Sequence, residues 1–349
     1  MEEPKNSAPE QPADKPEAID LGENRVFTDV VTPSTWTILA KEFLKDKLAL
    51  FCLFLYVGIV LTVFIWTGLL SADEITLVNM RIRNFDWAFA TDRFDEVRYN
   101  RDGHRMQPRG SMREQDWEQL RGPMYVLGTD PGGRSILMLL VYGARNSLLI
   151  SFAVAGVTLA TGTIVGLIAG FYAGNIDNFI MRIIDFLTMV PTLMVMILII
   201  MIFPRTPVFL AVSFMIFGWI GSARVVRMVT LQQGALDYVK ASKTLGTPNI
   251  VIIFREVVPN IVSFMLMQFT LALAGTMGIE TGLTIIGFGL PPDVPSLGAL
   301  VAWGTSATDM QQRPWLWLPA ATLILVMVLC INYVGQAIGR AADARRRRA

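Results

Sequence analysis

The polar stretch at residues 238–260 has the residue types of a binding element rather than those of a catalytic one. Its first eight residues can form about two helical turns. One narrow, mildly apolar face of this helix carries Val239, Ser242 and Leu245. Gly246 suits the left-handed position that ends a helix, and Pro248 prevents the helix from resuming. We therefore expect a small, rigid helix whose face fits a groove on a partner protein.

Side chains that could catalyse a reaction or hold a metal are few and scattered. The single histidine, His104, lies in a polar loop. Cys52 and Cys330 both lie in apolar runs, which favours small buried residues over a disulfide or a zinc site. No Gly-x-x-x-x-Gly-Lys-Ser/Thr motif occurs, so the sequence shows no nucleotide-hydrolysing loop. We expect no catalytic residue, no metal and no cofactor in this chain.

The composition indicates a membrane protein. The chain has 349 residues, of which 53% are hydrophobic, a net charge of +1 and a mean hydropathy of +0.47. These values are too apolar for a soluble domain and not basic enough for a nucleic-acid-binding protein. The predicted fold class is an all-α polytopic membrane protein with six transmembrane helices. The expected spans are residues 48–70, 148–172, 187–203, 208–223, 261–279 and 315–334.

The chain divides into segments of different composition. Residues 1–31 are predicted to be a disordered tail, because Pro, Glu, Asp and Ala dominate without an apolar period. Residues 32–47 read as an amphipathic helix on the membrane surface. The remaining predicted segments are a first span at 48–70, an extracellular loop at 71–145, a core at 146–342 with a loop at 230–260, and a basic tail at 343–349.

Charge predicts the orientation of the chain. An even number of spans puts both termini on one side of the membrane. Lys41, Lys45, Lys47 and the terminal Arg run favour that side being the cytoplasm, and the 230–260 loop then also faces the cytoplasm. The Arg-rich segment at 71–125 runs against this assignment, but long segments translocate with less regard to charge.

The spans contain little that could couple transport to an ion gradient. Glu280 and Asp185 are predicted to lie near helix ends, and the middles of the spans carry almost no ionisable residue. Carriers driven by protons or sodium usually keep charged groups at depth, so we expect the energy to come from elsewhere. Gly162, Gly166 and Gly170 recur every four residues, ahead of Gly174, and predict the close approach of another helix.

The 238–260 stretch resembles the Glu-Ala-Ala loop of ABC-importer permeases. Lys240-Ala241-Ser242 takes the place of Glu-Ala-Ala, with Lys replacing the Glu. Gly246 keeps the place of the family's Gly, and Glu256-x-Val258-Pro259 takes the end of the pattern. In the family, this helix docks on the ATP-hydrolysing subunit. The resemblance therefore implies that the ATPase-coupling residues are Tyr238, Val239, Ala241, Ser242, Leu245 and Gly246.

Three further elements narrow the resemblance. The stretches 128–135 and 142–148 resemble the opening of the core of C-type permeases for oligopeptides, dipeptides and nickel, with Ser135 in the place of an Asp. The stretch 280–298 looks like the Gly- and Pro-rich signature of the same family, with Thr284 and Ile285 departing from it. The structural motif residues that follow are Gly128, Asp130, Gly133, Arg134, Glu280, Gly287, Gly289, Pro292, Pro295, Ser296 and Gly298.

The resemblance implies a function, a fold and a set of partners. It implies the type I ABC-importer permease fold, with a small polar extracellular insertion between helices 1 and 2. The chain would form half of a translocation pathway for oligopeptides in a prokaryotic cell membrane. Its expected partners are a homologous second permease, two ABC ATPase subunits that hold ATP and magnesium, a substrate-binding protein outside the membrane, and lipid, but no nucleic acid. The Gly stripe and the fifth span are candidates for the seam between the two permease halves.

Other functions stay open at this point. A permease for dipeptides or nickel chelates would share the same motifs. An ATP-independent secondary transporter would require buried charges or symmetry between the halves of the sequence. A membrane-embedded enzyme would require a Ser/His or metal constellation at membrane depth, whereas His104 lies outside the predicted spans.

Overall fold

The computed structural model describes residues 40–69, 126–131, 134–291 and 294–346, with side chains to residue 342. All of them belong to one compact unit, Thr35–Ala349. These residues form helices and an isolated antiparallel bridge between Thr129 and Ser135, which confirms the all-α fold class. The predicted tail at 1–31, most of the surface helix at 32–47, and residues 71–125 of the predicted loop, including His104, lie outside the described residues.

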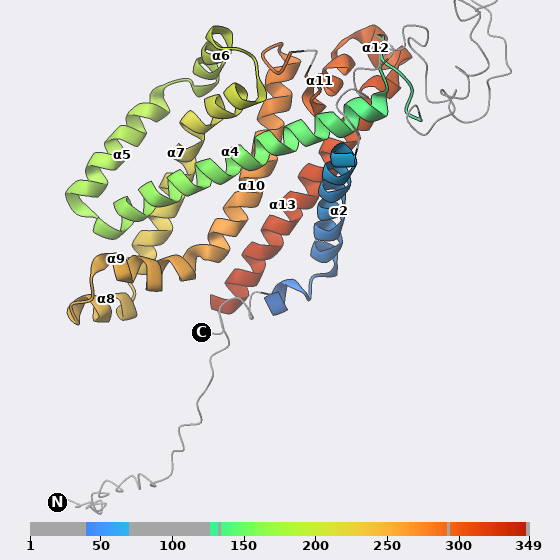
Figure 1. Cartoon of the computed structure of the whole chain (residues 1–349). Helices are drawn as coiled ribbons and strands as arrows, with labels where there is room; N and C mark the ends of the chain where they lie inside the picture. Colours follow the sequence, from blue (N-terminus) through green and yellow to red (C-terminus); the bar gives the residue numbers. More distant parts are fainter. Residues whose placement is uncertain (1–39, 70–125, 132–133, 292–293, 347–349) are drawn as a thin grey trace, which may run out of the picture. The chain divides into compact units, whose positions relative to one another are not determined.

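Within the described residues, five helical segments are long and apolar enough to cross a membrane, and a bent pair of helices could supply a sixth span. The bent pair is α5 (Gly174–Met189) and α6 (Thr192–Ile202), which meet at 72°. Pro191 lies at the break and disfavours helical backbone at Val190, which is extended. The five others are α2 (Lys47–Leu69), α4 (Ile136–Tyr172), α7 (Pro207–Gly234), the continuous run Asn249–Ile285, and α13 (Leu318–Arg346), as Figure 1 shows.

Three predicted boundaries differ from the structure because helices extend into polar sequence. α4 begins at Ile136, so the last ten residues of the predicted 71–145 loop are helical. Residues 175–185, which lie between the predicted spans at 148–172 and 187–203, are inside α5, and α7 continues eleven residues beyond the predicted end of its span at 223. For α5 and α7, the cause is ion pairing between these two helices. Arg224 donates to Asp185 at 2.6 Å, and Arg227 pairs with Asp177.

The glycine stripe of α4 packs against α7 of the same chain. A Cβ added at Gly162 would lie 2.9 Å from the carbonyl oxygen of Trp219, and one at Gly166 would lie 2.6 Å from that of Ala223. A Cβ at Gly170 would lie 2.7 Å from the carbonyl oxygen of Arg227. The expected close approach of a helix is therefore confirmed. The expectation that these glycines line a seam with another subunit was wrong, because α7 occupies them.

An apolar cluster joins α2 to the other helices. Tyr56 and Val63 of α2 are buried with Met327 and Ile331 of α13, and residues of α4 and of the 249–285 run complete the cluster. Cys330 is buried in the same cluster, and Cys52 packs against it; both are free thiols. Near the start of α2, the Arg340 guanidinium of α13 donates to Asp46 at 2.7 Å.

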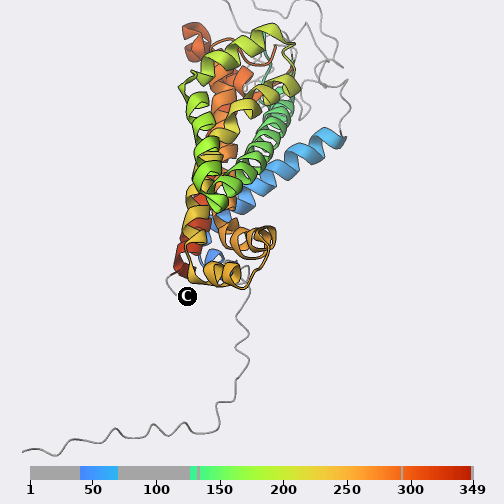
Figure 2. The same ribbon diagram turned by 90° about the vertical axis from the view of Figure 1, so that its left-hand side faces the viewer.

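Short helices gather at both ends of the long ones. One end, the α8 end, carries α8 (Asp237–Thr244), α9 (Asn249–Ile252) and the last turns of α13. The other end, the α11 end, carries α11 (Leu297–Ala302), α12 (Ala307–Gln312) and α6. The view in Figure 2 keeps the same separation. The helix α10 (Val258–Ile285) runs from one end to the other.

Candidate functional site

The helix α8 is closed by the glycine that the sequence singles out. Gly246 has a φ of 78°, the left-handed value that favours glycine. The Gly246 N–H donates to the Lys243 carbonyl at 3.1 Å, and the Thr247 N–H donates to the Ser242 carbonyl at 3.1 Å. This pair of bonds is the Schellman motif, and Pro248 then begins the next turn. The predicted short, closed helix is therefore present.

The structure divides the predicted binding face of α8. Val239 is fully buried among apolar residues of α9 and the start of the next helix. The Ser242 hydroxyl points the same way and donates to the Glu256 carboxylate at 2.6 Å. Leu245, in contrast, is 85% exposed. Tyr238 and Ala241 are exposed too, so Tyr238, Ala241 and Leu245 form an exposed face of α8.

Single polar contacts connect α8 to three other helices. The Tyr238 hydroxyl donates to Gln233 of α7 at 2.9 Å and accepts a hydrogen bond from Asn260 of α10 at 3.1 Å. The Lys243 ammonium lies 4.4 Å from the centre of the Phe171 ring of α4, within the range of a cation–π interaction. A displacement of α8 would therefore act on α4, α7 and α10 together.

The junction between α9 and α10 is a π-helical turn, η4 (Ile253–Val257). Pro259 follows directly, and its ring would clash with the carbonyl four residues earlier in a regular α-helix. A wider turn relieves such a clash, and single π-turns are frequent at functional sites. Glu256 lies in this turn. One of its carboxylate oxygens accepts from Ser242, and the other is buried without a partner in the described part of the chain.

A different arrangement holds the α11 end together. Glu280 of α10 is 1% exposed, and the Ser147 hydroxyl of α4 donates to its carboxylate at 3.1 Å. The Ser147 oxygen also accepts from the Leu297 N–H of α11 at 3.2 Å. Beside this pair, the Asn146 amide donates to the Pro295 carbonyl at 2.8 Å. These bonds join α4, α10 and α11, and we call Glu280, Ser147 and Leu297 the Glu280 cluster.

Glycines of the 280–298 signature allow this close packing. A Cβ added at Gly289 would lie 2.6 Å from the Cα of Thr284, and one at Gly298 would lie 3.1 Å from the Glu280 carboxylate. Gly287 has a φ of 88° and closes α10 with a second Schellman pair, in which Gly287 and Phe288 donate to Thr284 and Leu283. Of the other signature residues, Ser296 caps α11 by accepting from Ala299. Pro292 lies outside the described residues.

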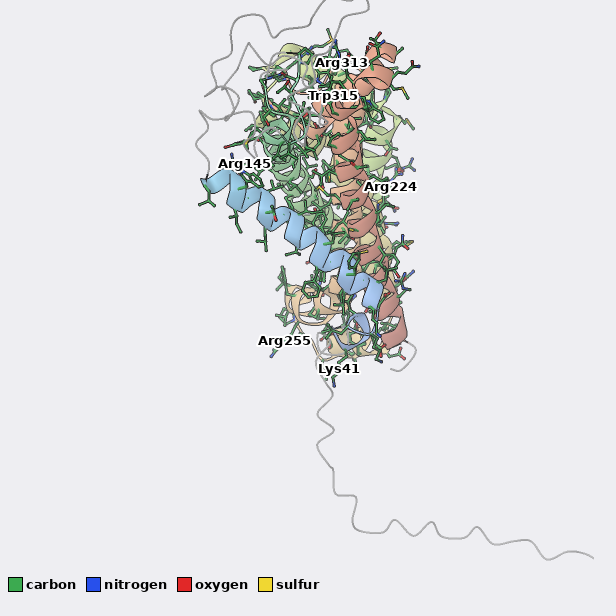
Figure 3. All side chains as sticks on the ribbon, turned by 90° about the vertical axis from the view of Figure 1, so that its right-hand side faces the viewer. Lys41, Arg145, Arg224, Arg255, Arg313 and Trp315 are labelled. Carbon is green, nitrogen blue, oxygen red and sulfur yellow. The ribbon has the colours of Figure 1, made fainter. Side chains whose placement is uncertain are left out.

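The 128–135 element lies at the same end. The Asp130 carboxylate accepts from the Arg134 backbone N–H at 2.8 Å and from its guanidinium at 2.7 Å. Gly128 has a φ of 84°, and its carbonyl accepts from Ile136, the first residue of α4. The Trp315 indole donates to the Thr129 carbonyl at 3.2 Å. Figure 3 shows Trp315 at this end, far from Arg255 at the α8 end. Gly133 lies outside the described residues.

Sequence reasoning missed several residues of these two groups. Ser147 and Asn146 stand as adjacent polar residues at the start of an apolar run, and this contrast was a usable signal. Glu256 lies within a matched motif, but its contact with Ser242, fourteen positions away, depends on the fold of the chain between them. The pairing of Asp177 with Arg227 spans fifty residues, and no local pattern announces it.

The long apolar helices define the class as a multi-pass membrane protein. Residues 162–348 match the family described as "Binding-protein-dependent transport system inner membrane component". Because this match covers more than half of the sequence, the chain belongs to that family. Members are membrane subunits of transport systems, which agrees with the expectation of a transport subunit.

Individual relatives support the same assignment. The oligopeptide transport system permease protein OppC of Lactococcus lactis subsp. lactis (strain IL1403) is 43% identical over 222 residues, which cover 63% of this chain and 76% of the relative. OppC of Bacillus subtilis (strain 168) is 35% identical over 225 residues, with 63% and 72% covered. A solved structure of the MetNI methionine ABC transporter in an inward-facing conformation aligns with a TM-score of 0.47 at 18% identity, covering 59% of this chain and 97% of that one.

Proposed function

We propose that this chain is one permease half of an ATP-driven importer of oligopeptides in a bacterial cell membrane. The observation that carries the proposal is α8, a short, capped helix with Leu245 85% exposed, in a chain of the binding-protein-dependent transport family. A helix that presents an apolar anchor outside the lipid suits the groove of a partner. The names of the relatives supply the substrate class.

In this proposal the α8 end faces the cytoplasm. Basic residues gather there, and Figure 3 shows Lys41 and Arg255 at this end. The rule that cytoplasmic segments carry an excess of Lys and Arg supports the orientation. Two ATPase subunits dock on the α8 helices of two homologous, different permeases and hold the ATP and magnesium. The binding protein delivers the peptide at the α11 end.

The mechanism follows from how α8 is held. ATP-driven closure of the ATPases displaces Leu245 and with it the whole capped helix. The contacts of Tyr238 and Lys243 transmit this displacement to α4, α7 and α10. Helices that move as near-rigid bodies keep their backbone groups paired, as the hydrocarbon core requires. The bundle thereby alternates between openings to the two sides of the membrane.

A charged anchor tests the docking step. Leu245→Asp in the assembled transporter should leave membrane insertion unchanged. It should lower peptide-stimulated ATP turnover at least tenfold, because docking loses roughly the free energy of burying one Leu side chain, about 1.5–3 kcal/mol. The measurement is ATP hydrolysis and peptide uptake in proteoliposomes. Leu245→Met is the matched control and should keep both activities. Wild-type turnover in the Leu245→Asp complex would refute the assignment of α8.

A further inference from the structure

A cavity at the α11 end has the size of a small-ligand site. Its volume is about 540 Å³. Sites for small ligands usually measure about 300–1,000 Å³. Its walls come from four places: the start of α4 with the loop before it, the turn between α6 and α7, the end of α10 with the loop after it, and the α11–α12 segment. The lining residues that matter below are Arg134, Arg205, Gly287, Trp303 and Asp309.

The charges around this cavity do not cancel. Arg134 is paired with Asp130 at 2.7 Å, and Asp309 is paired with Arg313 at 3.1 Å. Arg205 has no carboxylate within ion-pair distance among the described residues. Among the residues that the structure describes, one positive charge therefore faces the cavity without a matching negative one.

Arg205 is exposed, and one hydrogen bond connects it to the backbone after α10. Its Nη1 donates to the Gly287 carbonyl at 3.2 Å. That carbonyl belongs to the glycine of the α10 Schellman cap, whose left-handed backbone is fixed by two hydrogen bonds. A guanidinium carries five N–H donors, so the bond to Gly287 leaves donors for a ligand. Two parallel donors of this group match the geometry of a carboxylate.

Much of the remaining lining of the cavity is apolar. Leu290 and Leu300 line it beside Trp303. A ligand that fills the cavity should therefore carry one carboxylate and an apolar body, with one to a few residues of bulk. The free C-terminal end of a peptide has this chemistry.

We propose that this cavity is an entry site for the carboxyl terminus of the transported peptide, and that Arg205 recognises the terminal carboxylate. The assignment rests on the proposed function as a peptide importer. It adds a position where the chain itself selects its substrate, before the peptide enters the path between the permease halves. The Gly287–Gly289 loop, held against Thr284, sets the place of the guanidinium.

The test compares two forms of one peptide in proteoliposomes that contain the complete transporter and the binding protein. One form has a free C-terminal carboxylate, and the other is amidated. Arg205→Gln should raise the KM for the free peptide about three- to tenfold, the range of one charge-assisted contact at a partly exposed site. The KM for the amidated peptide should not change. Because the binding protein is the same in all four measurements, its own preference cancels.

Arg205→Lys is the matched control and should keep part of the preference for the free peptide, since the charge remains but the fork of donors is lost. An unchanged elution profile and melting temperature of Arg205→Gln in detergent exclude misfolding. An equal rise in KM for both peptides would mean that Arg205 contacts the binding protein, and would overturn the proposal. No change for either peptide would overturn it too. If the wild-type complex transports no peptide, the proposed function fails first, and the site falls with it.

Discussion

One helix ends in a glycine cap at each end of the protein. The two caps have the same geometry, but their surroundings differ. Gly246 ends α8 and Gly287 ends α10, each with positive φ and the same pair of capping hydrogen bonds. After Gly246 the chain is exposed, and α8 is held by one fully buried side chain, Val239, by single hydrogen bonds and by one cation–π contact. After Gly287 the loop packs at backbone distance against Thr284, beside the buried Glu280 cluster.

This difference indicates where the protein moves and where it stays fixed. Exposed single hydrogen bonds contribute little free energy each and can be exchanged for water. Segments with few buried contacts open at low free-energy cost. Shared, buried hydrogen bonds between three helices must be broken together. We therefore expect the α8 end to be the mobile end and the α11 end to be the fixed one.

The largest test of this contrast exchanges one glycine at each end for alanine. In Gly289→Ala the new Cβ would lie 2.6 Å from the Thr284 Cα, so the backbone must shift. We expect a loss of about 3 kcal/mol, the upper range for overpacking, and poor assembly with the partner subunits. In Gly246→Ala nothing lies within 4 Å of the new Cβ, and only the left-handed backbone is strained, by about 1–2 kcal/mol.

Melting temperatures in detergent and the yield of assembled complex provide the measurement. A similar loss for the two variants would remove the distinction between the ends. A larger loss for Gly246→Ala would reverse it.

The next test removes the carboxylate of the buried cluster. Glu280→Ala deprives the Ser147 hydroxyl of its acceptor in a site that is 1% exposed. A buried donor left without a partner costs about 1–3 kcal/mol, so the melting temperature should fall. Glu280→Gln keeps an acceptor oxygen of nearly the same shape and should fall less. Equal melting temperatures for wild type and Glu280→Ala would show that the cluster is not what fixes the α11 end.

At the α8 end, the corresponding carboxylate should affect coupling rather than stability. Glu256→Ala removes the bond from Ser242, a net contribution of about 1 kcal/mol, but also removes a buried oxygen without a partner. The melting temperature should therefore change little. The number of peptides transported per ATP hydrolysed should fall, because α8 loses its tie to the π-turn. Unchanged coupling would show that this bond transmits nothing.

The smallest expected effect concerns Asp46, where α2 begins. The Arg340 guanidinium donates to this carboxylate, and the Ala49 N–H adds a second bond, so the pKa of Asp46 lies below its ordinary value of 3.8. A carboxyl with a lowered folded pKa stabilises the protein at pH above its unfolded pKa and loses this contribution as pH falls through the folded pKa.

The melting temperatures of wild type and Asp46→Asn should therefore differ slightly and constantly above about pH 5, and converge below about pH 4. The difference should be small because the pair is solvent-exposed. A difference that grows as the pH falls would contradict this sign.

Hydropathy and helix-ending residues predict much of the fold. The all-α class follows from long apolar runs, and the α8 turn follows from Gly246 and Pro248, which act locally. The helical course of residues 175–185 could not be predicted from hydropathy, because Asp177 and Asp185 find their partners on α7. A pattern along one chain does not report a charge fifty residues away.

The candidate site shows the same limit. The spacing of Val239, Ser242 and Leu245 predicts a short helix with these residues near one another on its surface. It does not show which side of the helix the rest of the chain covers. The burial of Val239 depends on Ile252, Ile253 and Val257, which follow after a turn. The Glu280 cluster combines residues 133 positions apart, so motif matching placed Ser147 and Glu280 in separate motifs and could not show that they meet.

The glycine stripe limits how α4 and α7 can travel. The backbone of α7 packs against three successive glycines of α4, which are four residues, or about 6 Å, apart. If α7 slid a short distance along α4, a carbonyl of α7 would leave its place beside a glycine and clash with a neighbouring side chain. The two helices can therefore shift relative to each other only by one full glycine spacing or not at all. We expect them to move as one rigid unit when the transporter changes conformation.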